Sequence, residues 1–148
     1  MSSRGKRFKP ILRLAERDTE SAEQAVQQTR QQLAAAVTQR DQLLRYRAEY
    51  AQFQSGVQTA ASVLRQRSFV QGLDVAAEQQ TQQIEALADK VTAMQRQWGQ
   101  KRQRQLALER VAKRIAEREM NQKTQQEERF MDDQVTARWL QAQRQKPR

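Results

Sequence analysis

Two pairs of adjacent carboxylates near the C-terminus are the residues whose types and spacing come closest to acid–base chemistry. Glu127 and Glu128 are followed by Asp132 and Asp133, and Arg129 lies between the two pairs. Neighbouring carboxylates can serve as general acid and general base when a site holds them against a substrate. On a helix surface with an arginine between them, these four carboxylates are instead predicted to be solvated.

The other residue types exclude most remaining chemistry. The chain has no Cys and no His, which excludes a disulfide framework, zinc ligation by these residues and imidazole catalysis. It also has no Gly-rich phosphate loop and no Ser/His/Asp set. We therefore predict that the protein is not an enzyme, that it has no catalytic or metal-binding residue, and that it needs no cofactor.

The composition predicts thin helical packing in place of a thick globular core. Hydrophobic residues make up 37% of the 148 residues, aromatic residues only 5%, and the mean hydropathy is −1.01. The two prolines, Pro10 and Pro147, lie near the ends and leave the interior free for long helices. No long apolar run is present, so the sequence predicts a cytosolic helical protein without a membrane span.

Apolar residues recur at alternating steps of four and three, which is the heptad pattern of a coiled coil. The stronger array lies in the second half of the chain: Leu73, Ala77, Gln80, Ile84, Leu87, Val91, Met94 and Trp98. A second array, rich in alanine and threonine, precedes it: Leu12, Ala15, Thr19, Ala22, Val26, Thr29, Leu33, Ala36, Arg40, Leu43, Arg47 and Tyr50. Small residues on such a seam favour a close antiparallel pair of helices.

The two arrays predict an all-α fold, an antiparallel coiled-coil hairpin of two long helices in one domain over residues 1–148. Gln54, Ser55 and Gly56 interrupt the pattern, and Thr59 can cap the second helix. A short connection makes the helices antiparallel neighbours. The predicted parts are a basic N-terminal arm over 1–9, helix 1 over 10–54, a turn over 55–58 and helix 2 over 59–144. Helix 2 is longer and overhangs at its C-terminal end, and Gly72 is either within a continuous helix or at a bend.

Positive charge is concentrated in the terminal segments. Residues 1–17 carry six Lys/Arg and one acid, and residues 101–148 carry thirteen and seven. Residues 18–100 carry eight and nine, so they are nearly neutral. An antiparallel hairpin would bring both basic segments to the same end, where they would form a surface for a negatively charged partner.

Aromatic residues gather near the predicted turn: Tyr46, Tyr50, Phe53 and Phe69. Tyr46 and Phe69 are expected to flank the seam and to be exposed. Two interpretations stay open from the residues alone. These side chains can fill a splayed end of the coiled coil, or they can form an aromatic docking patch for a partner.

Several short segments together resemble the flagellar FliJ family of type III export proteins. They are Tyr46-Arg47-Ala48-Glu49-Tyr50, Gly56, Phe69 to Leu73, and Trp98 followed by Lys101-Arg102-Gln103-Arg104. The ends are similar too, at Lys6-Arg7-Phe8-Lys9-Pro10 and at Glu127-Glu128-Arg129-Phe130-Met131-Asp132-Asp133. The resemblance covers nearly the whole chain.

The resemblance implies a stalk that inserts in the hexameric flagellar export ATPase, promotes its assembly and activity, and couples it to the cytoplasmic domain of the membrane export gate. It also implies binding of export chaperones of late filament substrates. The protein would then be cytoplasmic and peripheral to the inner membrane through these partners, and would serve flagellum biogenesis and motility. The gate-binding residues implied by the match are Gln39, Leu43, Tyr46, Tyr50, Phe69, Leu73, Ala76 and Gln80.

The basic segments suggest a second set of contacts. We hypothesise that six cations bind the export ATPase by charge: Arg13, Arg17, Arg102, Arg104, Lys113 and Arg114. Three other functions stay open: a basic coiled-coil nucleic-acid-binding protein, a stalk protein of a non-flagellar type III secretion system, and a structural homodimer. Nucleic acid is not the expected partner, because no recognised nucleic-acid-binding motif is present.

Overall fold

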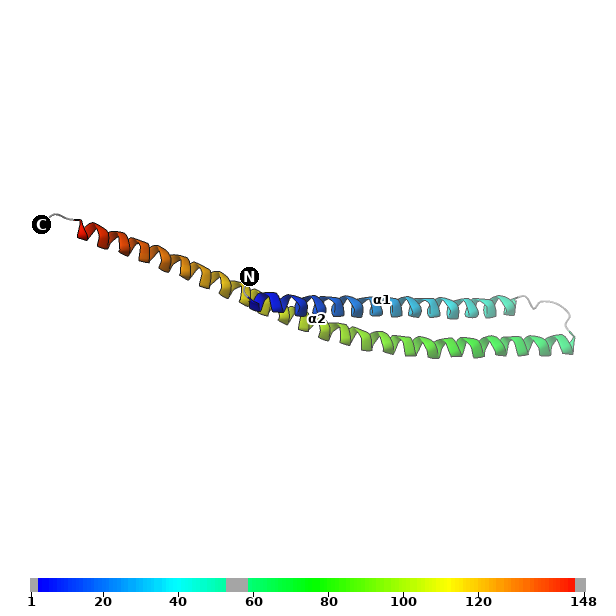
Figure 1. Cartoon of the computed structure of the whole chain (residues 1–148). Helices are drawn as coiled ribbons and strands as arrows, with labels where there is room; N and C mark the ends of the chain where they lie inside the picture. The colour runs from blue at the N-terminus through cyan, green and yellow to red at the C-terminus, as the bar shows by residue number, and fades with distance from the viewer. Residues whose placement is uncertain (1–2, 53–58, 146–148) are drawn as a thin grey trace. The chain divides into compact units, whose positions relative to one another are not determined.

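The computed structural model describes residues 3–52 and 59–145 and contains two long helices, α1 (Ser3–Gln52) and α2 (Ala60–Arg144) (Figure 1). The two helices pack against each other and the second is longer, as predicted. The chain divides into a central unit, Asp18–Lys101, and a terminal unit, Met1–Arg17 with Arg102–Arg148. The prediction of a single domain stays a prediction.

The two helices of the central unit are antiparallel (Figure 1). The Thr19 hydroxyl lies 3.4 Å from the Lys101 carbonyl oxygen, and the Gln80 amide donates to the Gln39 side chain at 3.2 Å. Positions later in α1 therefore meet positions earlier in α2. The alanine-rich seam of α1 faces α2 of the same chain, which is the intramolecular pairing that the hairpin prediction required.

Small side chains fill the seam of the central unit. Val26, Ala36, Ala77 and Val91 are its buried apolar residues, and Ala36 is only 4% exposed. Among the described residues, no large side chain is fully buried. The seam thus consists of a single layer of apolar contacts, and alanine lets the two helix axes approach closely.

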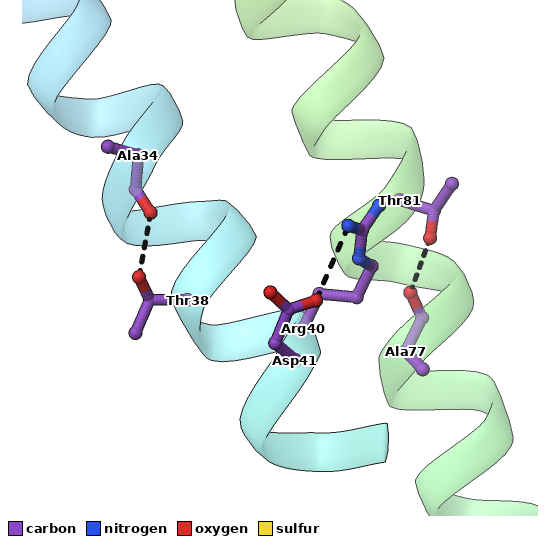
Figure 2. Close-up of polar contacts among 6 residues, drawn as sticks. All are labelled: Ala34, Thr38, Arg40, Asp41, Ala77 and Thr81. Atoms are coloured by element: carbon purple, nitrogen blue, oxygen red, sulfur yellow. Dashed lines mark hydrogen bonds and ion pairs between the residues drawn. The ribbon is translucent and has the colours of Figure 1, made fainter. Parts of the chain in front are cut away.

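Threonine can occupy the seam because its hydroxyl is satisfied within its own helix. The buried Thr29 hydroxyl donates to the Ala25 carbonyl at 2.8 Å and also contacts Met94 Sδ at 3.1 Å. Figure 2 shows two further cases, from Thr38 to Ala34 and from Thr81 to Ala77, both at 3.0 Å. A seam threonine therefore leaves no unpaired hydroxyl facing the partner helix.

Enlarging a buried alanine should test the close approach. We expect Ala36→Leu to destabilise the hairpin by about 1–3 kcal/mol, because three extra carbon atoms must fit where the helices touch. Ala35→Leu is the control, since Ala35 is exposed on the same turn and leucine has a similar helix propensity. Thermal unfolding followed by circular dichroism measures both. Equal stability of the two variants would contradict the close approach.

The start of α2 follows its local sequence. The Ser62 backbone N–H donates to the Thr59 hydroxyl at 3.2 Å, so Thr59 is the N-cap that the sequence predicted. The predicted turn over 55–58 and Phe53 lie outside the described residues. Further along, α2 passes through Gly72 without interruption, so this glycine does not separate two helices.

Gly72 offers a simple gain in stability. A methyl group added there would meet nothing within 4 Å. Gly72→Ala is therefore expected to stabilise the hairpin by about 0.5–1 kcal/mol, because glycine loses more backbone freedom in a helix than alanine does. Chemical denaturation of both proteins measures the difference. A decrease in stability would mean that α2 needs an unusual backbone conformation at this residue.

The beginning of α1 differs from the prediction. The predicted basic arm over 1–9 is helical from Ser3, and Pro10 lies inside the helix. Proline removes one backbone donor, but residues before it have a packing partner in the terminal unit. Gly5 and Phe8 line a groove with Ile115 and Glu119, and a methyl group on Gly5 would lie 3.2 Å from the Glu119 carboxylate. The local break signal is thus overridden by tertiary contacts.

The last part of α2 has no helix beside it within the described part of the terminal unit (Figure 1, orange to red). Every residue from 120 to 145 is exposed. The predicted C-terminal overhang is therefore confirmed. We refer to residues 120–145 as the extension.

Candidate partner-binding surfaces

The eight predicted gate-binding residues, which we call the gate set, all lie in the central unit. Two of its pairs touch across the hairpin. Gln80 donates to Gln39, and the Tyr50 and Phe69 rings lie 4.7 Å apart between centroids at 49°. Gln39 to Tyr50 is eleven residues forward in α1, and Gln80 to Phe69 is eleven residues back in α2. Eleven residues are about three helical turns, so the members of each helix share one face.

Exposure divides the gate set into two parts. Tyr46 is 64% exposed and Phe69 47%, as expected for residues that flank the seam. The four half-buried members belong to the seam itself: Leu43, Leu73, Ala76 and Gln80. The structure thus combines exposed aromatic rings with a supporting apolar floor. Such an arrangement can bind a protein partner at low entropic cost.

Two seam arginines near the gate set are paired with acids. Arg47 forms an ion pair with Asp74 across the hairpin, and Arg40 contacts its neighbour Asp41 at 3.4 Å (Figure 2). The Arg40 Nε and Gln80 Oε1 atoms are buried without a hydrogen-bond partner. A polar layer of this kind weakens apolar packing while fixing the register of a coiled coil.

The six predicted ATPase-binding cations, which we call the basic set, all lie in the terminal unit. All six are exposed. Across residues 3–52 and 59–145 the two ion pairs lie in the central unit, so none neutralises a member of the basic set. The terminal unit carries eighteen Lys/Arg and eight acids, whereas the central unit carries nine of each. The whole formal net charge of +10 therefore belongs to the terminal unit.

The carboxylate pairs of the extension do not form a chemical site. Glu127, Glu128, Asp132 and Asp133 are all exposed. Within the described ranges, no group of three or more His, Cys, Asp or Glu side chains could hold a metal ion. In the same part of the chain, neither helix is long and apolar enough in any stretch to cross a membrane.

Sequence reasoning missed an apolar stripe on the extension. Met131, Val135 and Trp139 follow one another at steps of four and are each at least 60% exposed, and Met120, eleven residues before Met131, is 66% exposed. Steps of four and eleven place side chains on nearly one helix face. The heptad search passed over this stripe because its phase differs from that of the main seam.

These surfaces define a class of protein: a helical hairpin with separate binding surfaces for protein partners and no catalytic machinery. The family model for the flagellar FliJ protein matches residues 4–144. The chain therefore belongs to the FliJ family and is a non-enzymatic component of the flagellar type III export apparatus. No curated protein and no solved structure matches significantly.

Proposed function

We propose that this protein is the stalk of the flagellar export apparatus. In this role it inserts in the hexameric export ATPase, promotes its assembly and activity, and couples it to the cytoplasmic domain of the export gate. It also assists export chaperones of late filament substrates. It acts in the cytoplasm, at the inner membrane, where these partners hold it.

The observation that carries the proposal is the division of charge between the two units. The terminal unit holds the whole net charge of +10, and its exposed basic set is free of ion pairs within the described residues. Exposed unpaired cations attract an acidic partner over about a Debye length and raise the association rate. We assign this unit to the ATPase.

The neutral central unit supports a different kind of contact. The gate set offers exposed rings, Tyr46 and Phe69, around the Tyr50–Phe69 pair. Binding through aromatic rings depends on desolvation more than on long-range charge, so it is less sensitive to salt. We assign the gate set to the export gate.

The experiment that tests the proposal measures ATP hydrolysis by the cognate export ATPase, with and without this protein, at low and high salt. We expect stimulation that saturates at about one chain per ATPase hexamer and that weakens at high salt. The absence of stimulation at either salt concentration would reject the stalk function. Salt-sensitive DNA binding in the same samples would then favour the nucleic-acid-binding alternative.

A further inference from the structure

A groove in the central unit belongs to neither the gate set nor the basic set. It has a volume of about 360 Å³ and is lined from α1 by Glu23, Val26, Gln27 and Arg30, and from α2 by Gln95, Trp98 and Gly99. The lining positions recur at steps of three and four on both helices. Side chains so spaced form the ridges and grooves into which a further helix packs.

Trp98 leaves a hydrogen bond unmade in this groove. Its ring is half-buried, and its indole Nε1 atom is buried without an acceptor. An indole N–H is a donor only and normally finds a partner when it is buried. The rim residues Gln27, Arg30 and Gln95 are exposed and have long side chains. Movement of one of them would let an acceptor from a partner reach the indole.

Gly99 has no reason within the chain to be glycine. A methyl group there would meet nothing within 4 Å, and glycine inside a helix costs about 0.5–1 kcal/mol relative to alanine. A missing side chain on a groove wall allows another backbone to approach closely. The open glycine and the unpaired indole lie next to each other on the same wall.

The charges on the rim restrict the occupant. Glu23 and Arg30 are seven residues apart on α1, or about 10 Å along the helix, with one charge on each side of the apolar floor. A complementary helix carries a basic side chain toward Glu23 and an acidic side chain about two turns away toward Arg30. An apolar stripe with one hydrogen-bond acceptor lies between them.

We propose that this groove binds an amphipathic α-helix of an export chaperone that has released its substrate. The inference rests on the proposed function, which gives the chain such chaperones as partners. Along α2, Trp98 is eighteen residues from Gln80, the nearest member of the gate set on that helix, or about 27 Å. A chaperone in the groove therefore leaves the gate set free, and both partners bind at once.

The test uses the full chain labelled with ¹⁵N and titrated with the empty chaperone. The two tryptophan indole signals are assigned with the Trp139→Phe variant. We expect the Trp98 indole signal to shift on binding while the Trp139 signal stays. Gly99→Leu should weaken binding about tenfold or more by filling the groove. Gly72→Leu is the matched control, because Gly72 is also an α2 glycine with open space around it, and it should bind like the unmodified chain.

Three results would overturn the inference: an unmoved Trp98 signal, unchanged binding by Gly99→Leu, or no binding by the unmodified chain. Loss of a self-associated form in Gly99→Leu, seen by sedimentation without any effect on chaperone binding, would assign the groove to a second copy instead. ATPase stimulation by the same variants separates the two levels. A chain that stimulates the ATPase but fails these tests keeps the stalk function and loses only the groove.

Discussion

Reversing three charges of the basic set is expected to abolish stimulation of the export ATPase. The variant carries Arg13→Glu, Arg102→Glu and Lys113→Glu, three exposed residues of the terminal unit. Each reversal removes two positive charges, so the net charge falls from +10 to +4, and all of the loss is in the terminal unit. Attraction to an acidic ring then becomes repulsion at three points, which lowers the association rate and the affinity together.

The matched control reverses three exposed cations of the central unit: Arg65→Glu, Lys90→Glu and Arg96→Glu. Its net charge also falls to +4, so any difference between the variants reports the location of the charge and not its amount. Both variants should keep their helical circular dichroism signal, because these side chains are exposed and no ion pair is lost. If the terminal variant still stimulates the ATPase fully, the basic set is not the ATPase contact.

Much of the fold follows from periodicity. Val26, Thr29, Ala77 and Val91 were placed on the seam by heptad spacing alone, and all four are buried. The reason is physical: a stripe that recurs every 3.5 residues has only one way to leave water, which is to face another helix. The N-cap at Thr59 was equally predictable, because capping depends on a residue type and its immediate neighbours.

The start of α1 could not be predicted in the same way. Pro10 is a strong local signal for the first turn of a helix, whereas the packing of Phe8 against Ile115 joins residues more than a hundred positions apart. The register that pairs Gln39 with Gln80 also depends on both helices and on the connection between them. Heptad spacing shows which face is buried without showing which residue lies opposite.

The candidate sites divide along the same line. Exposed cations and their grouping in one unit follow from composition and topology. The unpaired indole of Trp98 and the open space at Gly99 depend on how side chains of two helices meet, so only the three-dimensional structure reveals the groove. Membership of the FliJ family identifies the export apparatus, and the residues that contact each partner remain proposals.

Replacing both tyrosines of the gate set is expected to abolish binding to the cytoplasmic domain of the export gate while ATPase stimulation is kept. Tyr46 is 64% exposed, so its ring is available to a partner, and Tyr50 packs on Phe69 and supports the same face. Buried aromatic anchors at interfaces contribute about 2 kcal/mol or more, which is roughly thirtyfold in affinity. The Tyr46→Ala, Tyr50→Ala variant is measured by titration calorimetry against the isolated gate domain.

Stability and binding must be separated in this variant, because the Tyr50–Phe69 contact also stabilises the hairpin by about 0.5–1.5 kcal/mol. Tyr46→Ala alone removes a mostly exposed ring and should lower affinity with little change in thermal stability. Leu64→Ala with Val75→Ala is the control: both side chains are more than half exposed in the central unit and lie outside the gate set. If Tyr46→Ala lowers stability as much as the double variant and leaves gate binding intact, these aromatic residues close the end of the coiled coil and do not bind the gate.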